Sequence, residues 1–373
     1  MADWYAYQRL PVGRGGTVCR IPFEDEVMVG ALPDHCSLLA DATADLLGEP
    51  ARRRRVLVVV PTRGRPHRAA RQLRAVPEEY DILLLATAPQ DLPAKLTRRS
   101  GVRCEVGAYP ALDGPSFPTP HPDLAAKRNF GMVTARREGY DATIFIDDDI
   151  DIGPEDLRLM VTALNTHDIV GRRSVGLADH SVLYRVLSRA GLVKPFISGS
   201  CMATRAEYSG KFPNIYNEDW FFMWPALGHR GVGRLGDVRQ VKLEAESGNQ
   251  LGRAATEELG DVLAEGFLRT LHEAARVGQR GPAEASLGAE EYWADALSRR
   301  LFLYELAYTL LAESRWPDRD VLMENLRSGH RVLAEFSTTQ LAASAVELSA
   351  FSPGSAVCGT TRTAAGVGGK SYS

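Results

Sequence analysis

Three consecutive aspartates, Asp147, Asp148 and Asp149, follow the apolar run Ile144-Phe145-Ile146. The β-branched and aromatic residues of that run predict a short buried strand. Three adjacent carboxylates repel one another at neutral pH, and each one costs free energy if it is buried without a partner. Carboxylate oxygens are the ligands that Mg²⁺ and Mn²⁺ prefer, and Mg²⁺ often shares its sites with substrate phosphates. The cluster therefore predicts a divalent metal that holds a phosphorylated substrate at the carboxyl end of a strand.

Three other interpretations of this cluster remain open. An exposed acidic turn after a strand would have no function. The spacing Asp147-Asp148-x-x-Asp151 matches the acidic motif of prenyl-chain synthases, although that motif lies on helices of all-α proteins. The pair Asp149-x-Asp151 is similar to the motif of haloacid-dehalogenase phosphatases, whose nucleophilic strand usually lies near the start of the domain. Here the strand follows another α/β unit, so the surrounding segments have to decide.

The elements that position these residues alternate between strands and helices. The run Val56–Val60 is continuously apolar, as is typical of a central parallel strand covered on both faces. Further strands are expected at Tyr80–Ala86 and Val102–Val106, and helices at Arg68–Ala75 and Asp123–Glu138. This alternation predicts an α/β fold with a mostly parallel, wound sheet, in which ligands bind outside the carboxyl ends of the strands.

The chain divides into four expected regions. Residues 1–50 would form an N-terminal extension with a short helix at Ser37–Leu47, and residues 51–250 the α/β domain. Residues 251–350 would form a helical C-terminal region. Residues 351–373 are rich in Gly, Ser and Thr, which predicts a disordered tail.

Three further polar segments accompany the acidic cluster. They are Pro61-Thr62-Arg63-Gly64-Arg65 after the first strand, Ala126-Lys127-Arg128-Asn129-Phe130-Gly131 on the helix before the acidic strand, and Asn217-Glu218-Asp219-Trp220. Over roughly residues 54–245, their order resembles the GT-A glycosyltransferases, especially the broad family 2 group. Those enzymes show a strand ending in Pro-Thr-x-x-Arg, an Ala-Arg-Asn-x-Gly helix, an Asp-x-Asp strand end and a Glu-Asp pair. The resemblance implies a GT-A (nucleotide-diphospho-sugar transferase) fold in residues 51–250 and sugar transfer from a nucleotide-sugar donor to a hydroxyl acceptor.

The resemblance also assigns roles on the donor side. It makes Asp149 the direct ligand of Mn²⁺ or Mg²⁺, with Asp147 as a second ligand or a ribose contact. The metal would neutralise charge that develops on the diphosphate leaving group. Lys127 and Arg128 would add positive charge, and Asn129 would bond the sugar or nucleotide. The complete donor-binding set is Pro61, Thr62, Arg63, Arg65, Lys127, Arg128, Asn129, Asp147 and Asp148.

The sequence departs from the family after the second strand. Members often carry an acidic turn there that reads the base. This chain has Ala86-Thr87-Ala88-Pro89 instead, with Asp91 just beyond. The identity of the donor base therefore stays open.

Activation of a hydroxyl acceptor needs a general base within hydrogen-bond reach. Asp219 matches the family's base position in inverting members, so inversion by single displacement is favoured, and Glu218 would contact the acceptor. Trp220 and Phe221 would form an apolar platform for a sugar ring. The run Ser198-Gly199-Ser200 would form a tight turn on the acceptor side.

Each of these assignments has a structural alternative. Lys127 and Arg128 could form a solvated helix face, and Asn129 a capping or core contact. The Glu218–Asp219 pair could cap a helix, since carboxylates favour helix N-termini. The two aromatic residues could pack in the core. Two histidines, His229 and His272, are left out of the metal site because a lone histidine is more often structural.

The composition is ordinary for a soluble globular protein. Of 373 residues, 45% are hydrophobic and 24% charged, and the net charge of −3 does not mark a general nucleic-acid binder. No apolar run reaches the length of a membrane span, no signal peptide is evident, and the five cysteines are scattered. We therefore expect a cytoplasmic enzyme with a small or soluble hydroxyl acceptor. The helical region would shape the acceptor pocket or a homo-oligomer contact.

Two rival functions remain at this stage. A nucleotidyltransferase acting on a sugar phosphate would normally carry a Gly-rich loop with a basic residue after its first strand, which Gly64-Arg65 matches poorly. A non-catalytic nucleotide- or carbohydrate-binding protein could share the fold. The presence of both the acidic cluster and the Glu-Asp pair favours an enzyme.

Overall fold

The structure is a computed structural model, and its description covers most of the chain. The described residues are 32, 34–43, 54–94, 101–110, 113–175, 181–194, 196–229, 231–241, 250–279 and 284–351. The predicted tail after residue 351 and most of the predicted N-terminal extension lie outside them.

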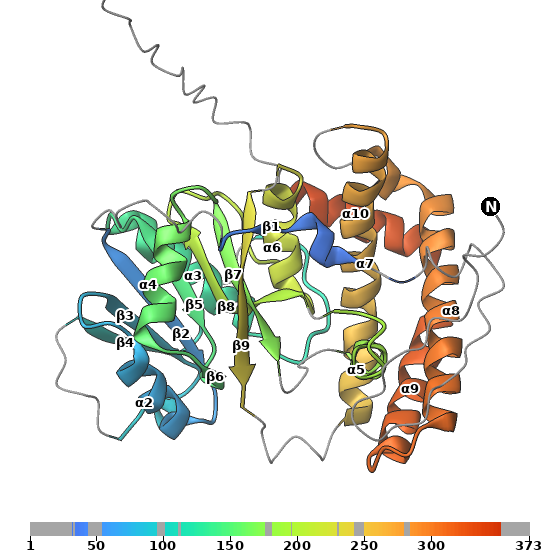
Figure 1. Cartoon of the computed structure of the whole chain (residues 1–373), viewed down its shortest axis with the longest axis horizontal. Coiled ribbons are helices and arrows are strands. Elements are labelled where there is room, and N and C mark those ends of the chain that lie inside the picture. The colour runs from blue at the N-terminus through green and yellow to red at the C-terminus, as the bar shows by residue number, and fades with distance from the viewer. Residues whose placement is uncertain are drawn as a thin grey trace, which may run out of the picture.

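A mixed sheet forms the centre of the described chain (Figure 1). Its order is β1-β9-β7-β8-β5-β2-β3-β4, and β6 pairs with β9. Neighbours from β5 through β2 and β3 to β4 run parallel, whereas β8 runs antiparallel to both β5 and β7. The strands are β1 (Ala40–Asp41), β2 (Val56–Thr62), β3 (Asp81–Ala86), β4 (Val102–Val106), β5 (Ala142–Ile146), β6 (Ile150–Asp151), β7 (Ile169–Val175), β8 (Ile197–Arg205) and β9 (Val232–Gln240). The predicted α/β class with a mostly parallel sheet is confirmed.

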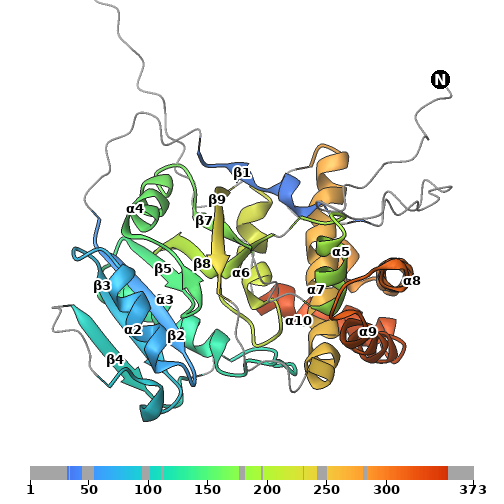
Figure 2. The same ribbon diagram turned by 60° about the horizontal axis from the view of Figure 1, so that its bottom comes forward.

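Helices cover both faces of this sheet (Figure 2). The α-helices are α2 (Pro66–Ala75), α3 (Leu124–Arg137), α4 (Pro154–Ala163), α5 (Val182–Arg189), α6 (Glu218–Leu227), α7 (Gln250–Arg276), α8 (Glu290–Glu313), α9 (Arg319–Leu333) and α10 (Thr338–Phe351). Val58 of β2 packs in the core with α2 and α4, whereas Val59 packs in the core with α3 and α6. A Cβ atom on Gly131 of α3 would lie 2.7 Å from Cγ2 of Val59, so glycine permits this close helix–strand approach.

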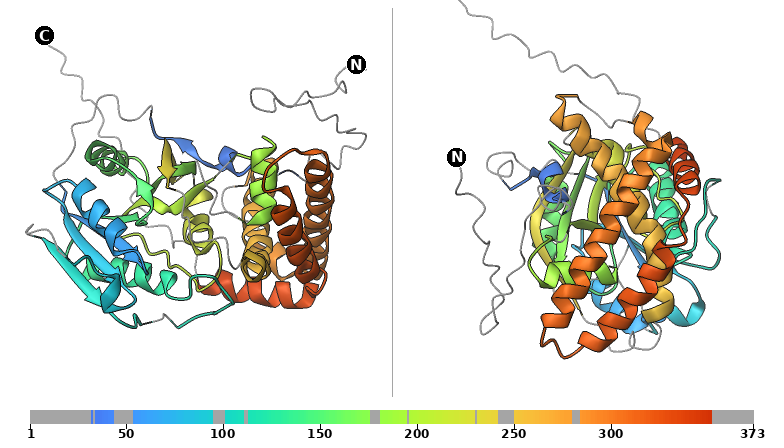
Figure 3. Two further views of the ribbon diagram at one scale, coloured as in Figure 1. Left: turned by 90° about the horizontal axis from the view of Figure 1, so that it is seen from below. Right: turned by 90° about the vertical axis from the view of Figure 1, so that its right-hand side faces the viewer.

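The last four helices gather at the end of the molecule away from β4, with α5 beside them (Figures 1 and 3). Their buried leucines and aromatic residues join the same hydrophobic core as α3 and α6. Trp293 of α8 is fully buried in this core, and its indole N–H donates to the carbonyl of Leu287 at 2.8 Å. The region is therefore packed against the sheet domain, and the predicted domain boundary near residue 250 stays a prediction.

Two local expectations were wrong. The helix predicted at Ser37–Leu47 is a 3₁₀ turn, His35–Leu38, followed by β1, because β1 pairs in parallel with the edge of β9. Residues 44–47 lie outside the described chain. The predicted turn Ser198-Gly199-Ser200 lies inside β8, which pairs with β5 and β7. In the part of the chain that the structure describes, no helix has the length and apolar character needed to cross a membrane.

Candidate functional site

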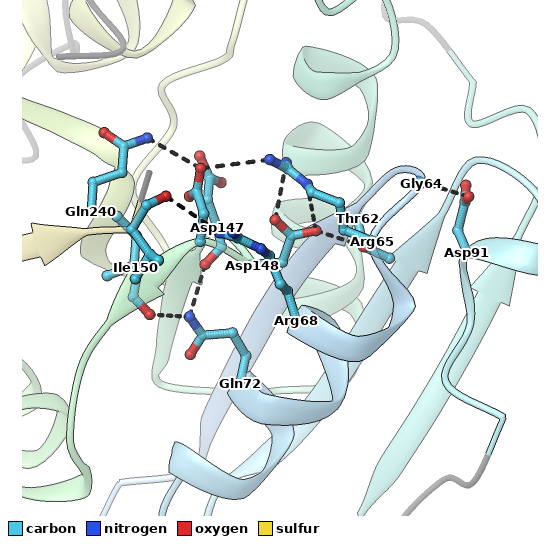
Figure 4. Close-up of polar contacts among 12 residues, drawn as sticks. Thr62, Gly64, Arg65, Arg68, Gln72, Asp91, Asp147, Asp148, Ile150 and Gln240 are labelled. Atoms are coloured by element: carbon cyan, nitrogen blue, oxygen red, sulfur yellow. Dashed lines mark hydrogen bonds and ion pairs between the residues drawn. The ribbon is translucent and has the colours of Figure 1, made fainter. Parts of the chain in front are cut away.

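The three aspartates form a tight turn where β5 ends, close to the carboxyl end of β2 (Figure 4). The N–H of Asp147 donates to the carbonyl of Ser200 at 2.9 Å, and the N–H of Ile150 donates back to the carbonyl of Asp147 at 3.3 Å. The side chains of Asp148 and Asp149 are almost completely buried. The interpretation as an exposed acidic turn is therefore wrong.

Asp148 is paired within the protein. Its Oδ2 accepts a hydrogen bond from Thr62 Oγ1 at 2.8 Å and from Arg65 Nε at 3.2 Å. Its Oδ1 lies 2.9 Å from Arg65 Nη2, so the guanidinium contacts both carboxylate oxygens (Figure 4). Burial raises the pKa of Asp148, and Arg65 opposes that rise. Asp148 therefore ties the turn after β2 to the acidic turn.

Asp149 is less completely paired. Its Oδ2 accepts from Gln240 Nε2 at 3.2 Å and lies 3.6 Å from Arg65 Nη1. Its Oδ1 is buried and has no hydrogen-bond partner among the described residues. Burial raises the pKa of Asp149 to about 7, with Asp147 adding to the rise and Arg65 opposing it. A buried carboxylate oxygen without a partner costs free energy, and a bound cation would remove that cost.

The described residues contain no group of three His, Cys, Asp or Glu side chains arranged to hold a metal ion. A metal here would have to be held by one or two carboxylates. That donor set suits Mg²⁺ bound together with substrate phosphates, which complete its coordination. Asp149 fits this requirement best, with Asp147 beside it.

Arg128 joins the acidic turn to the Glu-Asp pair. Its side chain is 3% exposed, and Nη2 donates to the two oxygens of Asp147 at 3.0 and 3.3 Å. Its Nη1 donates to Oε1 of Glu218. Burial lowers the pKa of Arg128, but Asp147 and Glu218 more than compensate, so this pKa is raised and the guanidinium stays charged. The buried guanidinium of Arg128 therefore pairs with a carboxylate of the acidic turn and with a carboxylate of the Glu-Asp pair.

Gly199 of β8 lies against this cation. A Cβ atom there would lie 2.5 Å from Nη1 of Arg128 and 3.0 Å from Cβ of Asp219. Glycine is needed at this position for space and not for a turn. The segment Ser198-Gly199-Ser200 was singled out from the sequence as a tight turn, which is not the reason that glycine is needed here.

Glu218 and Asp219 begin α6. Both are buried, and Asp219 accepts the N–H of Gly199 at Oδ2 at 2.6 Å and the N–H of Trp220 at Oδ1 at 2.9 Å. Burial raises the pKa of Glu218 to about 8, with Arg128 opposing and Asp219 adding to the rise. Burial also raises the pKa of Asp219, again with Arg128 opposing. The capping alternative thus holds in part, since Asp219 binds a backbone N–H in the first turn of the helix.

Lys127 points to a different part of the site from its neighbour Arg128. Its Nζ donates to the Thr62 carbonyl at 3.0 Å and to Thr87 Oγ1 at 2.7 Å, and pairs with Asp123 Oδ2 at 2.7 Å. Lys127 therefore lies where β2 and β3 end. Both basic side chains are buried, so the alternative of a solvated helix face is wrong.

The remaining predicted site residues differ in their surroundings, and whether Pro61 and Arg63 bind a donor stays a prediction. Asn129 donates to the Phe212 carbonyl at 2.7 Å and accepts the Phe212 N–H at 3.0 Å, so its amide holds the core, as the structural alternative proposed. Pro61 is buried within β2, and Arg63 is exposed on the following turn. The aromatic platform is wrong as well, because its two side chains are buried.

The two aromatic residues pack against other rings. The Trp220 ring meets Phe196 edge-on at 5.3 Å, and the Phe221 ring meets Phe267 edge-on at 5.1 Å. His272 lies with its ring 5.7 Å from that of His35, outside the carboxylate site.

Sequence reasoning missed three polar residues that organise the site. Gln72 Nε2 donates to the carbonyls of Asp147 and Ile150 and so fixes the acidic turn (Figure 4). Gln240 reaches Asp149 from β9. Gln72 lies on the buried side of α2 next to Leu73, and a polar residue on an otherwise apolar helix face was a readable signal. Gln240 had no such signal, because its strand pairing could not be foreseen.

A third missed residue, Asp91, ties together the loops after β2 and β3. Its Oδ1 accepts the N–H of Gly64 at 2.7 Å (Figure 4). Its Oδ2 accepts the N–H of Ala88 at 3.0 Å. From the sequence, Asp91 was noted just beyond the position where family members carry a base-reading turn, and no role was assigned to it. Its carboxylate is committed to the protein backbone.

Comparison with known proteins adds little. No protein family matches the chain, and no curated protein matches it. Among solved structures, one from Desulfovibrio desulfuricans G20, named "putative nucleotide-diphospho-sugar transferase", aligns with 58% of this chain and 97% of its own, at 14% identity and a TM-score of 0.33. At this identity and TM-score, the similarity does not indicate the function of this chain.

Proposed function

We propose that this chain is a glycosyltransferase that moves a sugar from a nucleotide-sugar donor to a hydroxyl acceptor. The observation that carries the proposal is the position of Arg128, which bridges the acidic turn and the Glu-Asp pair through contacts of about 3 Å or less. The acidic turn would receive the donor diphosphate, and the start of α6 would receive the acceptor. Sugar transfer needs these two functions side by side.

Asp149, with Asp147, would hold Mn²⁺ or Mg²⁺ together with the diphosphate. The metal would supply charge neutralisation for the leaving group. Arg65 is 30% exposed, whereas Arg128 is 3% exposed, and Arg65 would therefore bind a phosphate. Lys127 would lie nearer the nucleoside, because it binds at the ends of β2 and β3.

Asp219 would be the general base. Each of its oxygens accepts one backbone N–H, which orients the carboxylate and leaves further lone pairs for an acceptor hydroxyl. Its pKa is raised by burial, which makes it a better proton acceptor than an exposed aspartate. Glu218 is committed as the counter-ion of Arg128. The base would take the proton of the acceptor hydroxyl while the acceptor oxygen bonds to the anomeric carbon and the nucleoside diphosphate leaves from the opposite face, and this single displacement inverts the anomeric configuration.

A thermal-shift screen tests this proposal. UDP, GDP, dTDP and CDP and the corresponding triphosphates are each added with and without Mn²⁺, and the matching nucleosides serve as controls. A nucleotide at about 100 times its Kd stabilises a protein by about 2.7 kcal/mol, which is a readable shift. We expect one diphosphate to stabilise the chain far more than its nucleoside, and only with the metal. No stabilisation by any diphosphate, or a preference for a triphosphate, would contradict the proposal, and the latter would favour the nucleotidyltransferase.

A further inference from the structure

The residue before the Glu-Asp pair has an unusual backbone. Asn217 has φ of +63°, and it is the only non-glycine with positive φ in the described parts of the chain. Asparagine adopts this left-handed conformation more readily than most residues, but the conformation still costs free energy. It persists where surrounding contacts hold it in place.

Helix α7 supplies two such contacts. Asn217 Nδ2 donates to Asp261 Oδ1 at 2.7 Å. One residue earlier on α7, a Cβ atom on Gly260 would lie 2.4 Å from the carbonyl oxygen of Tyr216, so the helix backbone packs directly on the turn. Two independent contacts thus clamp residues 216–217 against the helical region.

Helix α8 fixes Asp261 in turn. Arg300 donates to Asp261 Oδ2 through Nη2, and it donates to Glu258 through Nε at 3.0 Å and Nη2 at 3.1 Å. Tyr304 donates its hydroxyl to Glu258. All four side chains are buried.

The presence of this buried network is not well explained by a gain in the stability of the fold alone. Buried ion pairs are often no more stabilising than apolar residues of similar volume, because their desolvation offsets the attraction between the charges. Breaking one, however, leaves an uncompensated buried charge. The network therefore constrains the geometry of whatever it binds, and here it binds the turn that leads into α6.

We infer that the α7–α8 network, defined as Glu258, Asp261, Arg300 and Tyr304, positions Glu218 and Asp219 by holding Asn217 in its left-handed conformation. The helical C-terminal region is then a positioning part of the catalytic site. The catalytic meaning of this inference rests on the proposed function. Its structural content, control of the first turn of α6, does not.

A double-mutant cycle tests the inference. Asn217→Asp keeps a residue that tolerates positive φ but places two carboxylates face to face. Asp261→Asn removes one of them, and the double variant restores an amide–carboxylate pair with donor and acceptor exchanged. We expect Asn217→Asp to lower kcat by about 10- to 100-fold while the donor KM changes less than twofold, and the double variant to recover most of the loss. The matched control is Tyr292→Phe, which removes a buried hydrogen bond to the Gly266 carbonyl in the same helical region but touches neither Asn217 nor Asp261.

Amide hydrogen exchange of residues 218–221 gives a readout that needs no activity. Faster exchange there in Asn217→Asp, reversed in the double variant and absent in Tyr292→Phe, supports the inference. Unchanged kcat and exchange in Asn217→Asp would overturn it, as would equal changes in Tyr292→Phe. If the native chain acts on no nucleotide sugar, the proposed function fails, and the exchange data alone decide the inference.

Discussion

The substitution Asp219→Asn isolates proton transfer from the other roles of this residue. General-base help is typically worth about 10²–10⁴-fold in rate, or about 3–5 kcal/mol of barrier. In the structure both carboxylate oxygens accept a backbone N–H, from Gly199 and from Trp220. An asparagine can satisfy only one of them, so the variant should also lose about 1–3 kcal/mol of stability.

The assay is steady-state turnover with varied donor, together with urea unfolding. We expect kcat to fall by about 10²–10⁴-fold with the donor KM nearly unchanged. The part of the acidic limb of the rate profile that comes from Asp219 should also disappear, because the native enzyme loses rate as pH falls through the raised pKa of Asp219. The part that comes from protonation of Asp149, the proposed metal ligand, whose pKa is about 7, should remain. Glu218→Gln is the matched variant. It keeps an oxygen for Arg128 and should alter turnover less than Asp219→Asn does. A folded Asp219→Asn variant with near-native kcat, or a larger loss of turnover in Glu218→Gln, would refute the base assignment.

Three further expectations follow from single side chains. Asp149→Ala should remove the Mn²⁺-dependent part of nucleoside diphosphate affinity in calorimetry without unfolding the chain, and unchanged affinity would exclude Asp149 as a ligand. Gly199→Ala should cost about 1–3 kcal/mol in urea unfolding, because the new methyl group meets Arg128 and Asp219, and a neutral result would show that β8 can yield. Burial and the nearby His35 lower the pKa of His272 from 6.5 to about 4, so the unfolded chain binds more protons and stability rises with pH across that window. His272→Gln should therefore lose less stability than the native chain when the pH is lowered from 7 to 4.5, and equal losses would contradict this reasoning.

Much of the sheet was predictable because its signals are local. The run at Val56–Val60 is dense in β-branched residues, and a central parallel strand buried on both faces needs that composition. The run at Val102–Val106 begins and ends with valine and forms the edge strand β4, which is only partly buried. The structure extends the first run to Thr62 and confirms the second without change. The expected helix at Ser37–Leu47 failed because pairing with the edge of β9 overrode local helix propensity.

The motifs selected several side chains that the structure brings together, but they did not predict the contacts that those side chains make. The order of motifs pointed to Arg128 and Lys127 together, yet the two side chains lie at different strand ends. Asn129 and Trp220 belong to the core, because a motif match cannot tell a side chain that faces a ligand from one that faces the interior. Gln240 lies 91 residues after Asp149 in the sequence, and its contact with Asp149 depends on how the strands are ordered in the sheet.

The most direct test of the account is release of nucleoside diphosphate from nucleotide sugars by the native chain and by Asp149→Ala. Each common UDP-, GDP-, dTDP- and CDP-sugar is incubated with and without Mn²⁺, and the released nucleotide is quantified. A metal-dependent glycosyltransferase should release nucleoside diphosphate from at least one donor, only with the metal, and Asp149→Ala should lose that release. No release from any donor by the folded native chain, or equal release by the variant, would contradict it.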